Sequence, residues 1–295
     1  MNKILITGAT GNLGSDVAKR LKDKIGTNSI AVLVRNGHSE KAKQYHTDGF
    51  EVRVGDYDDY ETLTNAFAGI ETLYFVSGSD LDKRFQQHKN VVQAAKQAGV
   101  KHILYTSTVR KDESEKAPLH LVVNAHKQTE LWIQESGLAY TILRHNLYSE
   151  VVYMFIGDKT LLQKSKIVYL PARNGKTAFV AREDFAEAEA IILSEPEKHK
   201  NKIYEFNASA TVSFYDIARL LSETLGEDIQ YISPSVTDFE ATLKSMGLPD
   251  AIISLTTMFS LGIANGEFDK TENDLETILG RKTKTMAAYI KDVYQ

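Results

Sequence analysis

The first half of the chain alternates short apolar runs with segments in which apolar residues recur every three or four positions. Continuous apolar runs bounded by turn residues are typical of strands buried on both faces of a parallel sheet. Such runs are Lys3–Thr7, Ile30–Val34, Val52–Val54, Thr72–Val76, His102–Thr106 and Ala139–Arg144. Helical spacing predicts helices between them, including Ser39–Thr47, Thr62–Ala68, Asp82–Ala98 and Leu119–Ser136. Six strands alternating with helices predict an α/β fold with a doubly wound, Rossmann-type parallel sheet.

The regular alternation fades after residue 150. Short strands are expected at Ile167–Leu170, Ala178–Ala181 and Ile203–Phe206, and helices at Asp184–Leu193, at Ser213–Leu225 and over most of the chain from Pro234 onward. No Gly/Ser-rich linker or repeat separates the two halves. We predict a doubly wound domain at residues 1–150 and a smaller C-terminal α/β lobe at residues 151–295, partly interleaved with the first. The lobe is expected to close over the strand ends, where the pockets of open α/β sheets lie.

Three glycines, Gly8, Gly11 and Gly14, follow the first apolar run and open the first helix. A turn of this kind brings backbone N–H groups and a helix N-terminus up to a phosphate with no side chain in the way. The spacing G-x-x-G-x-x-G departs from the commoner dinucleotide fingerprint G-x-G-x-x-G, but the strand before it and the amphipathic helix after it are the context that the motif requires. The alternative is a plain glycine-rich connection between a strand and a helix.

Arg35 follows the second predicted strand, where a doubly wound fold meets the adenosine ribose of a dinucleotide. An acidic residue at this place binds a free 2′-hydroxyl, whereas an arginine accommodates a 2′-phosphate. The sequence Arg35-Asn36-Gly37 contains no acid, and a charged bond from a guanidinium to a phosphate is about twice as strong as a neutral one. Arg35 therefore favours NADPH over NADH, unless it is a solvated loop charge.

Two further strand ends carry candidate contacts. Asp56, after the third strand, has two equal interpretations. It contacts the adenine amino group with Tyr57 packed beside it, or Asp56 or Asp58 caps the next helix. After the fourth strand, Ser77-Gly78-Ser79 are small enough to let the backbone lie against the ribose on the nicotinamide side, although a simple turn also needs small residues.

Composition excludes several classes of protein. The 295 residues are 42% hydrophobic and 25% charged, as in an ordinary globular chain. With no cysteine, disulfides and thiolate metal sites are excluded, which fits a reducing cytoplasm. The net charge of -4 and the absence of a long basic block argue against nucleic acid as a partner.

Other patterns are missing as well. Because a strand is predicted within three residues of the N-terminus, we expect no signal peptide. No apolar run approaches the roughly eighteen residues of a membrane helix. The eight histidines include no H-E-x-x-H or comparable cluster, so we predict no metal site.

The chemistry of carbonyl reduction gives a further test. A short-chain dehydrogenase that reduces an aliphatic carbonyl usually protonates the alkoxide with a Tyr that has a Lys four residues further on. None of the 14 tyrosines has a lysine at that position; Tyr105, for example, is followed there by Val109. This absence disfavours the epimerases and dehydratases that a glycine motif also fits.

Acceptors that need little help with protonation are still compatible with the sequence. Hydride addition to a quinone gives a phenolate whose pKa is near that of a phenol, about 10, so that water can protonate it. A cationic triarylmethane dye takes hydride at carbon and needs no proton. For such acceptors the protein supplies orientation and electrostatics while the cofactor carries the chemistry.

Several motifs together resemble the NmrA-like, atypical short-chain reductases. The likeness is closest to their bacterial type 2 NAD(P)H:quinone oxidoreductases and triphenylmethane reductases. The motifs are Gly8-Ala9-Thr10-Gly11-Asn12-Leu13-Gly14, Val34-Arg35-Asn36, Gln87-His88-Lys89-Asn90-Val91-Val92, Ala98-Gly99-Val100-Lys101-His102-Ile103, His126 with Thr129-Glu130, Tyr140-Thr141-Ile142-Leu143-Arg144 through Tyr148-Ser149, and Leu243-Lys244-Ser245-Met246-Gly247-Leu248-Pro249-Asp250.

The resemblance implies an NADP(H)-binding fold and a set of contact residues. The expected cofactor contacts are Gly8, Thr10, Gly11, Asn12, Leu13, Arg35, Val76, Ser77, Gly78, Arg144, Asn146, Tyr148 and Ser149. His126 is a candidate proton donor or a holder of the nicotinamide region, with a satisfied structural histidine as the alternative. Asn146 and Tyr148 are candidates for hydrogen bonds to an acceptor oxygen, or they line the turn after the strand.

One departure affects the substrate. His145-Asn146-Leu147-Tyr148 stands where many relatives have Asn-Gly-Trp-Tyr, which changes the size and polarity of the pocket wall. We therefore expect a cytoplasmic, NADPH-dependent oxidoreductase of quinones or similar electron-poor aromatics. The alternative is a catalytically inactive NADP(H)-sensing regulator of the NmrA type, to which the missing Tyr/Lys pair is also suited. A homodimer is compatible with the sequence, which does not fix the oligomeric state.

Overall fold

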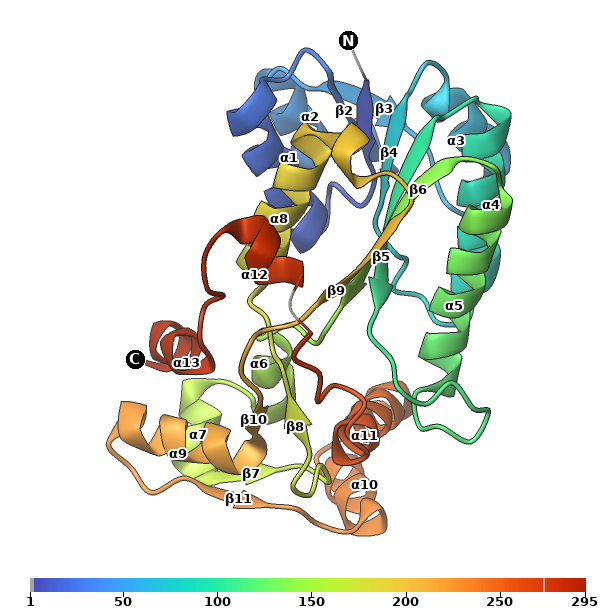
Figure 1. Ribbon diagram of the computed structural model, residues 1–295. Helices are drawn as coiled ribbons and strands as arrows, with labels where there is room; N and C mark the ends of the chain where they lie inside the picture. Colours follow the sequence, from blue (N-terminus) through green and yellow to red (C-terminus); the bar gives the residue numbers. More distant parts are fainter. Residues whose placement is uncertain (1–2, 273) are drawn as a thin grey trace. The chain divides into compact units, whose positions relative to one another are not determined.

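The computed structural model describes residues 3–272 and 274–295 (Figure 1). Its main element is a seven-stranded sheet in the order β3-β2-β1-β4-β5-β6-β9. The strands of this sheet are β1 (Ile4–Ile6), β2 (Ile30–Val34), β3 (Glu51–Val54), β4 (Thr72–Phe75), β5 (His102–Thr108), β6 (Ala139–His145) and β9 (Lys202–Phe206). The order of the first six is the doubly wound order, which reverses direction between β1 and β4.

Strands β1 to β5 pair in parallel. Ile4 of β1 lies between Ile30 of β2 and Thr72 of β4, and β3 and β5 continue the parallel pairing outward on either side. Every residue of β1, β2 and β4 is buried, as expected for continuous apolar runs covered on both faces. The carboxyl ends of β1 and β4 therefore lie side by side at one edge of the sheet.

Helices cover both faces of this sheet. Figure 1 shows α1, α2 and α8 on one face and α3, α4 and α5 on the other. Their bounds are α1 (Asn12–Ile25), α2 (Glu40–Thr47), α3 (Tyr60–Phe67), α4 (Arg84–Gln97), α5 (His120–Glu135) and α8 (Arg182–Ser194), followed by a 3-10 turn, η1 (Pro196–His199). The apolar faces of α3 and α4 pack on the sheet through Phe67 and Val91, which are fully buried with Phe75 and Ile103.

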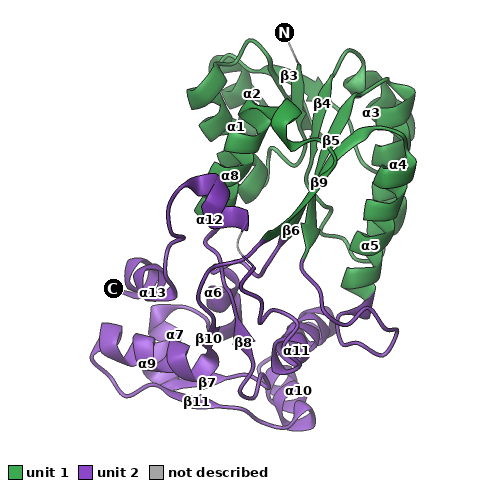
Figure 2. Ribbon diagram, viewed as in Figure 1, with its two compact units in different colours: residues 1–108, 121–144, 183–205 green, residues 109–120, 145–182, 206–295 purple. Residues whose placement is uncertain are grey.

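The chain divides into two compact units (Figure 2). Unit 1 comprises Met1–Thr108, Leu121–Arg144 and Glu183–Glu205, and unit 2 comprises Val109–His120, His145–Arg182 and Phe206–Gln295. Unit 1 contains nearly all of the main sheet and the helices on its two faces.

Unit 2 is built from small sheets and helices. β10 (Val212–Ser213) pairs antiparallel with β8 (Lys176–Thr177), and β11 (Gln230–Ile232) pairs parallel with β7 (Ile167–Tyr169). The helices are α6 (Val151–Ile156), α7 (Lys159–Ser165), α9 (Phe214–Leu225), α10 (Val236–Ser245), α11 (Asp250–Ala264), α12 (Asp274–Leu279) and α13 (Met286–Tyr294). A capping box between Ser213 and Asp216 begins α9, whose apolar face buries Phe214, Ile217 and Leu221.

The doubly wound α/β class predicted from the sequence is confirmed, and all six predicted strands of the first half are present within a residue or two of their expected ends. The strand expected at Ala178–Ala181 is wrong. This apolar segment is buried, but its backbone bonds go to irregular segments: Ala178 N donates to Phe268 O, and Val180 N donates to Leu147 O. The strand expected at Ile203–Phe206 is β9, which adds a seventh strand to the main sheet.

Candidate functional site

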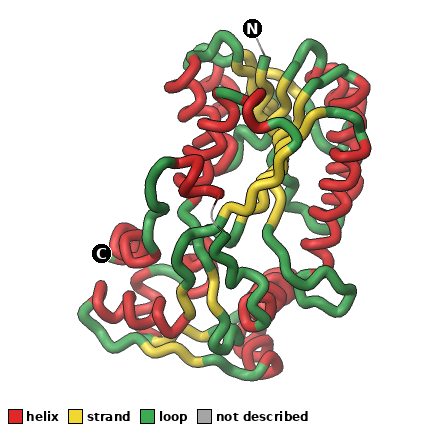
Figure 3. Tube along the Cα trace, viewed as in Figure 1, coloured by secondary structure: helices red, strands yellow, loops and turns green. Residues whose placement is uncertain are grey.

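A cavity of about 430 Å³ lies in unit 1 at the carboxyl ends of β1, β2, β3 and β4. The loops after these strands (green in Figure 3) supply most of its walls. The lining residues are Gly8, Thr10, Gly11, Leu33, Arg35, Gly55, Asp56, Tyr57, Asp58, Val76, Ser77, Gly78, Ser79, Asp80, Lys83 and Gln87. This is the crevice at the switch point of a doubly wound sheet, where such folds bind their ligands.

The glycine turn forms one wall of the cavity, and two of its glycines have no room for a side chain. Gly8 has a φ of 61°, in the left-handed region, and a Cβ on it would lie 2.8 Å from Cβ of Val76. A Cβ on Gly14 would lie 2.5 Å from the carbonyl oxygen of Gly8. The turn closes through a bond from Gly11 N to Gly8 O (2.9 Å). Gly8 and Gly14 are therefore required by close packing, against Val76 and against the backbone of the turn itself.

Helix α1 begins at this turn. Gly11 is its N-cap, with no side chain to bond the amides of the first turn, and the helix has no acidic residue there. The first N–H groups of a helix have no acceptor within it, and they carry the positive end of its dipole. Asn12 is exposed, whereas Leu13 is buried and offers only its backbone amide. The beginning of α1 is therefore suited to an anion.

Arg35 lies in the cavity wall just after β2. Its side chain is exposed and, among the residues that the structure describes, has no hydrogen bond or ion pair. The following turn is ordered by a bond from His38 N to Asn36 Oδ1 (2.9 Å), and Ser39 caps α2. A second cation is close to the glycine turn, because Lys41 Nζ donates to the carbonyl oxygen of Thr10. Sequence reasoning missed Lys41, which no local motif indicates.

Three acidic residues follow β3, and the structure shows which of them caps the next helix, α3. Neither Asp56 nor Asp58 caps α3; the cap is Asp59, whose carboxylate accepts from Glu61 N and Thr62 N. Asp56 lines the cavity and accepts from Asp58 N (3.0 Å), while Lys83 Nζ lies 3.5 Å from Asp58. The position of Asp56 thus fits the alternative of a ligand contact.

Tyr57 joins the loops after β1 and β4. Its hydroxyl lies within hydrogen-bond distance of Thr7 Oγ1 and of the carbonyl oxygen of Val76 (2.9 Å). Val76 N in turn donates to Thr7 Oγ1 (3.0 Å). Burial raises the pKa of Tyr57 well above its usual value, so the phenol is not an acid at neutral pH. The neutral hydroxyl instead connects the two loops by hydrogen bonds.

Ser77 and Gly78, just after β4, form another part of the cavity wall. Ser77 N donates to Thr106 Oγ1 (2.9 Å) at the end of β5. Gly78 N donates to His88 Nε2 (2.9 Å), and Gly78 O accepts from Arg84 Nε (2.7 Å). A Cβ on Gly78 would lie 2.9 Å from Gln87 Oε1, because α4 approaches closely. A side chain at Gly78 would therefore require the end of the Gln87 side chain to move.

His126 lies on α5 and is buried, not among the residues that line the cavity. Its Nδ1 is 2.7 Å from Tyr105 Oη, and its ring is near that of His88. The role of His126 as a proton donor stays a prediction.

Arg144 is held by carboxylates within unit 1. Its guanidinium makes two bonds to Glu130 (2.7 Å and 3.1 Å) and one to Glu205 (3.1 Å), and Ser107 Oγ also donates to Glu130. These bonds fix the end of β6 against α5 and β9. Any contact that Arg144 makes with a cofactor would have to share the guanidinium with this network.

Asn146, Tyr148 and Ser149 belong to the turn after β6, in unit 2. Asn146 Nδ2 donates to Asn207 Oδ1 (2.7 Å) and to the carbonyl oxygen of Phe268 (3.1 Å), and its Oδ1 accepts from Leu147 N (2.8 Å). Tyr148 Oη is 3.2 Å from His145 Nδ1, and Ser149 N donates to a carbonyl oxygen at 2.8 Å. The turn is thus held by bonds within itself and by bonds to Asn207 and Val180, and the ligand contacts expected of it are still predictions.

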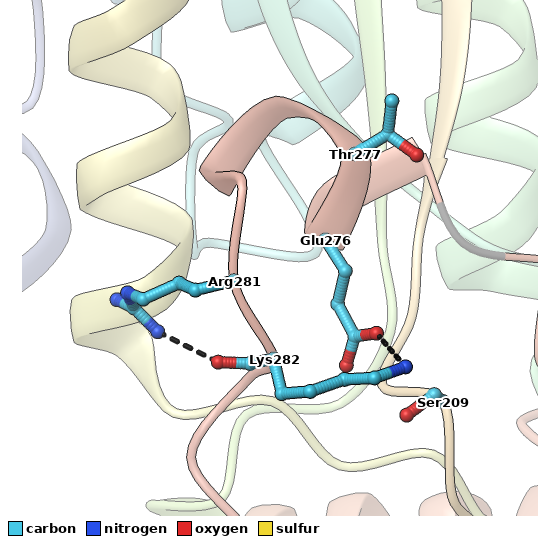
Figure 4. A pocket seen from close by; sticks show the side chains of 5 residues that line it. All are labelled: Ser209, Glu276, Thr277, Arg281 and Lys282. Carbon is cyan, nitrogen blue, oxygen red and sulfur yellow. Dashed lines mark hydrogen bonds and ion pairs between the residues drawn. The ribbon is translucent and has the colours of Figure 1, made fainter.

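Unit 2 has a cavity of its own, of about 560 Å³ (Figure 4). It is lined by Ser209, Glu276, Thr277, Arg281 and Lys282. Lys282 Nζ is 2.8 Å from Glu276 Oε2, and Arg281 Nη1 donates to the carbonyl oxygen of Lys282. Burial raises the pKa of Glu276, but hydrogen bonds from Lys282 and the Thr283 amide outweigh it and lower the pKa below its usual value. The Glu276 carboxylate is thus paired with a cation, whereas the Arg35 guanidinium has no partner among the described residues.

Across residues 3–272 and 274–295, no group of three or more His, Asp or Glu side chains is placed to hold a metal ion. In the same residues no helix combines the length and the apolar character needed to cross a bilayer.

The model of the NmrA-like family matches residues 1–290. The chain belongs to the NmrA-like family. It is 35% identical to quinone oxidoreductase 2 of Escherichia coli over 291 residues, which cover 99% of this chain and 98% of that protein. It is also 24% identical to the NAD(P)H azoreductase of Xenophilus azovorans, over 98% of this chain and 96% of that one.

Two solved structures have the same fold as this NmrA-like chain. The E. coli NADPH-dependent quinone oxidoreductase in complex with NADPH superposes with a TM-score of 0.90, at 34% identity, over 99% of this chain and 100% of that one. Triphenylmethane reductase of Citrobacter sp. in complex with NADP(H) gives a TM-score of 0.89, also at 34% identity and with the same coverage. The resemblance inferred from the motifs is therefore confirmed over nearly the whole chain.

Proposed function

We propose that the chain is an NADPH-dependent oxidoreductase that transfers hydride to a quinone or a similar electron-poor aromatic acceptor. The observation that carries this proposal is the cavity of unit 1. Its wall contains a glycine turn, the beginning of a helix and an arginine without a partner among the described residues. The chain is also 34% identical to a reductase solved with NADPH.

The residues of this cavity fit NADPH. Amides of the Gly8–Leu13 segment would hold the pyrophosphate, because Gly8, Thr10 and Gly11 line the cavity where α1 begins. Arg35 would bind the 2′-phosphate, with Lys41 as a nearby second cation. Val76–Gly78 would lie against the nicotinamide side, and the Arg144–Ser149 segment would shape the acceptor site. These assignments are proposals that rest on the cavity, on the order of the strands and on the family.

When bound, NADPH supplies the hydride. The protein would then hold the acceptor close to the nicotinamide in the orientation needed for hydride transfer, and exclude water. Tyr148 carries a hydroxyl that would hydrogen-bond an acceptor oxygen, and His126 is the remaining proton-donor candidate. Asn146 would have to release one of its two Nδ2 bonds, to Asn207 or to Phe268, before it could donate to an acceptor. None of the tyrosines has the lysine partner of a carbonyl reductase, which suits an acceptor whose reduced oxygen is a phenolate.

The direct test follows NADPH absorbance with a panel of quinones and a cationic triphenylmethane dye, in protein first shown to bind NADPH by fluorescence titration. We expect NADPH to be oxidised only when an acceptor is present. A protein that binds NADPH but reduces no member of the panel would overturn the proposal and favour the regulatory alternative. A cytoplasmic location and a homodimer stay predictions, to be tested by fractionation and by light scattering.

A further inference from the structure

His88 and Arg84 contact the wall of the cavity from behind. They lie one turn apart on α4, so their side chains share a face of that helix. His88 Nε2 accepts from Gly78 N (2.9 Å), and Arg84 Nε donates to Gly78 O (2.7 Å). Gly78 lines the cavity, whereas His88 is fully buried and Arg84 is 9% exposed. Both backbone polar groups of one wall residue are therefore held by side chains that do not line the cavity.

We propose that His88 and Arg84 are positioning residues, which hold the Ser77–Gly78 wall in the conformation that receives the nicotinamide half of NADPH. This inference rests on the proposed function, because it takes the cavity to be the NADPH site. Neither residue is expected to touch the cofactor. They act through the Gly78 backbone, which has no side chain with which to fix its own position.

The hydrogen bonds define a single tautomer of His88. An amide N–H only donates, so Nε2 must be the acceptor, and the proton of the neutral ring is on Nδ1. Nδ1 is 2.8 Å from Thr129 Oγ1, which donates its own hydrogen to the carbonyl oxygen of Ala125 (2.7 Å). Thr129 is thus an acceptor for the Nδ1 proton. The bonds form one directed chain from Gly78 through His88 to α5.

The environment keeps the imidazole neutral. Burial, with a smaller contribution from the charge of Arg84, lowers the pKa of His88 to about 3. A protonated ring would have to donate from Nε2, where Gly78 N also donates, so charging the ring would break the contact. The ring is therefore neutral, and the contact to the cavity wall intact, at neutral pH.

A purely structural role is the competing explanation, since a buried histidine also stabilises its helix. The two explanations predict different relations between the loss of stability and the loss of nucleotide binding. If His88 only supports the fold, a loss of stability should weaken nucleotide binding no more than an equal loss elsewhere on α4. If it positions Gly78, binding should fall more than stability alone accounts for.

Three variants separate these explanations. His88→Leu removes the acceptor for Gly78 N but retains apolar bulk. His88→Gln places an amide oxygen near the position of Nε2 and restores the acceptor. Val92→Ala, one turn further along α4, shortens a buried side chain that does not line the cavity and serves as the matched control for stability.

Dissociation constants for NADPH and NADH are measured by fluorescence, well below each melting temperature. We expect His88→Leu to weaken both nucleotides about tenfold, because a buried donor is left without an acceptor. His88→Gln should bind within about threefold of the wild type, and Val92→Ala within about twofold. Unchanged binding by His88→Leu, or equal weakening by Val92→Ala at equal stability, would overturn the inference.

A second measurement does not depend on nucleotide binding. Exchange of the Gly78 amide hydrogen, followed by NMR, should be slow in the wild type and in His88→Gln and much faster in His88→Leu. The nitrogen-15 spectrum should show His88 as the neutral Nδ1–H tautomer between pH 5 and pH 8. A wild type that binds neither nucleotide would overturn the proposed function, whereas rapid exchange of Gly78 or the opposite tautomer would overturn the inference itself.

Discussion

Replacement of Arg35 by alanine tests the assignment of the cofactor most directly. The guanidinium is exposed in the cavity wall and has no partner among the described residues, so its removal breaks no internal bond. The variant should therefore fold with unchanged stability. Any effect on nucleotide binding is then an effect on the ligand contact and not on the protein.

The magnitude follows from the type of bond. A hydrogen bond to a charged group contributes about 1.5–3 kcal/mol, and exposure to solvent favours the lower end of that range. Loss of about 1.5 kcal/mol weakens NADPH about tenfold, since 1.4 kcal/mol corresponds to a factor of ten. NADH lacks the 2′-phosphate and should change by less than about twofold. Lys41 remains near the turn and limits the loss.

The assay is a fluorescence titration of Arg35→Ala with both nucleotides at low and high salt. Lys96→Ala, which removes an exposed cation from the last turn of α4, controls for the change in net charge. We expect the preference for NADPH to fall about tenfold in Arg35→Ala alone, and its dependence on salt to fall as well. Equal weakening of NADPH and NADH would refute the reasoning, because a selector of the 2′-phosphate cannot act on a nucleotide without one.

Other predictions concern stability, the glycine turn and protonation. The pKa values of buried His88 and His102 fall to about 3 and about 4, so the unfolded chain binds more protons below pH 6.5 and stability decreases as the pH falls. Between pH 7.5 and pH 5 the loss should be about 2 kcal/mol per histidine, measured by urea unfolding, and a flat profile would contradict it. Gly14→Ala should abolish NADPH binding, because its Cβ would meet a backbone oxygen at 2.5 Å. Gly69→Ala, with open space and a φ of 72°, should cost about 1 kcal/mol of stability and leave binding intact. Tyr148→Phe should slow quinone reduction severalfold but leave dye reduction unchanged, since the dye needs no proton; equal slowing of both would exclude a proton role.

The main sheet could be predicted because its strands are continuous apolar runs. A parallel strand buried on both faces has no alternating pattern, and the runs at β1, β2 and β4 end at glycine, arginine or serine turns. The same rule failed at Ala178–Ala181, where a buried but irregular segment has the composition of a strand. Short elements such as β10 and α6 were missed, because two to six residues are too few for a period to show.

The candidate site was predictable where it is local in sequence. The glycine turn and Arg35 each follow a strand directly, so position along the chain indicates position at the sheet edge. Lys41 and His88 were missed as parts of the site, because each reaches the cavity wall from a helix through a contact 10 or 31 residues away. His88 belongs to a motif shared with the family, but a motif alone does not say that an imidazole accepts from a glycine amide.

The spacing of the glycine motif has a physical explanation in the packing of three elements. Gly8 turns the chain in the left-handed region where Val76, just after β4, leaves no room for a Cβ. Gly11 closes the turn and caps α1, and Gly14 lets the first turn of α1 pass directly over the carbonyl group of Gly8. Gly8 is thus limited by Val76, whereas a Cβ on Gly11 or on Gly14 would approach the carbonyl oxygen of Gly8, at 3.2 Å and 2.5 Å. Gly8 and Gly11 also line the cavity, so the beginning of α1, with its unpaired backbone amides, lies where a phosphate would bind.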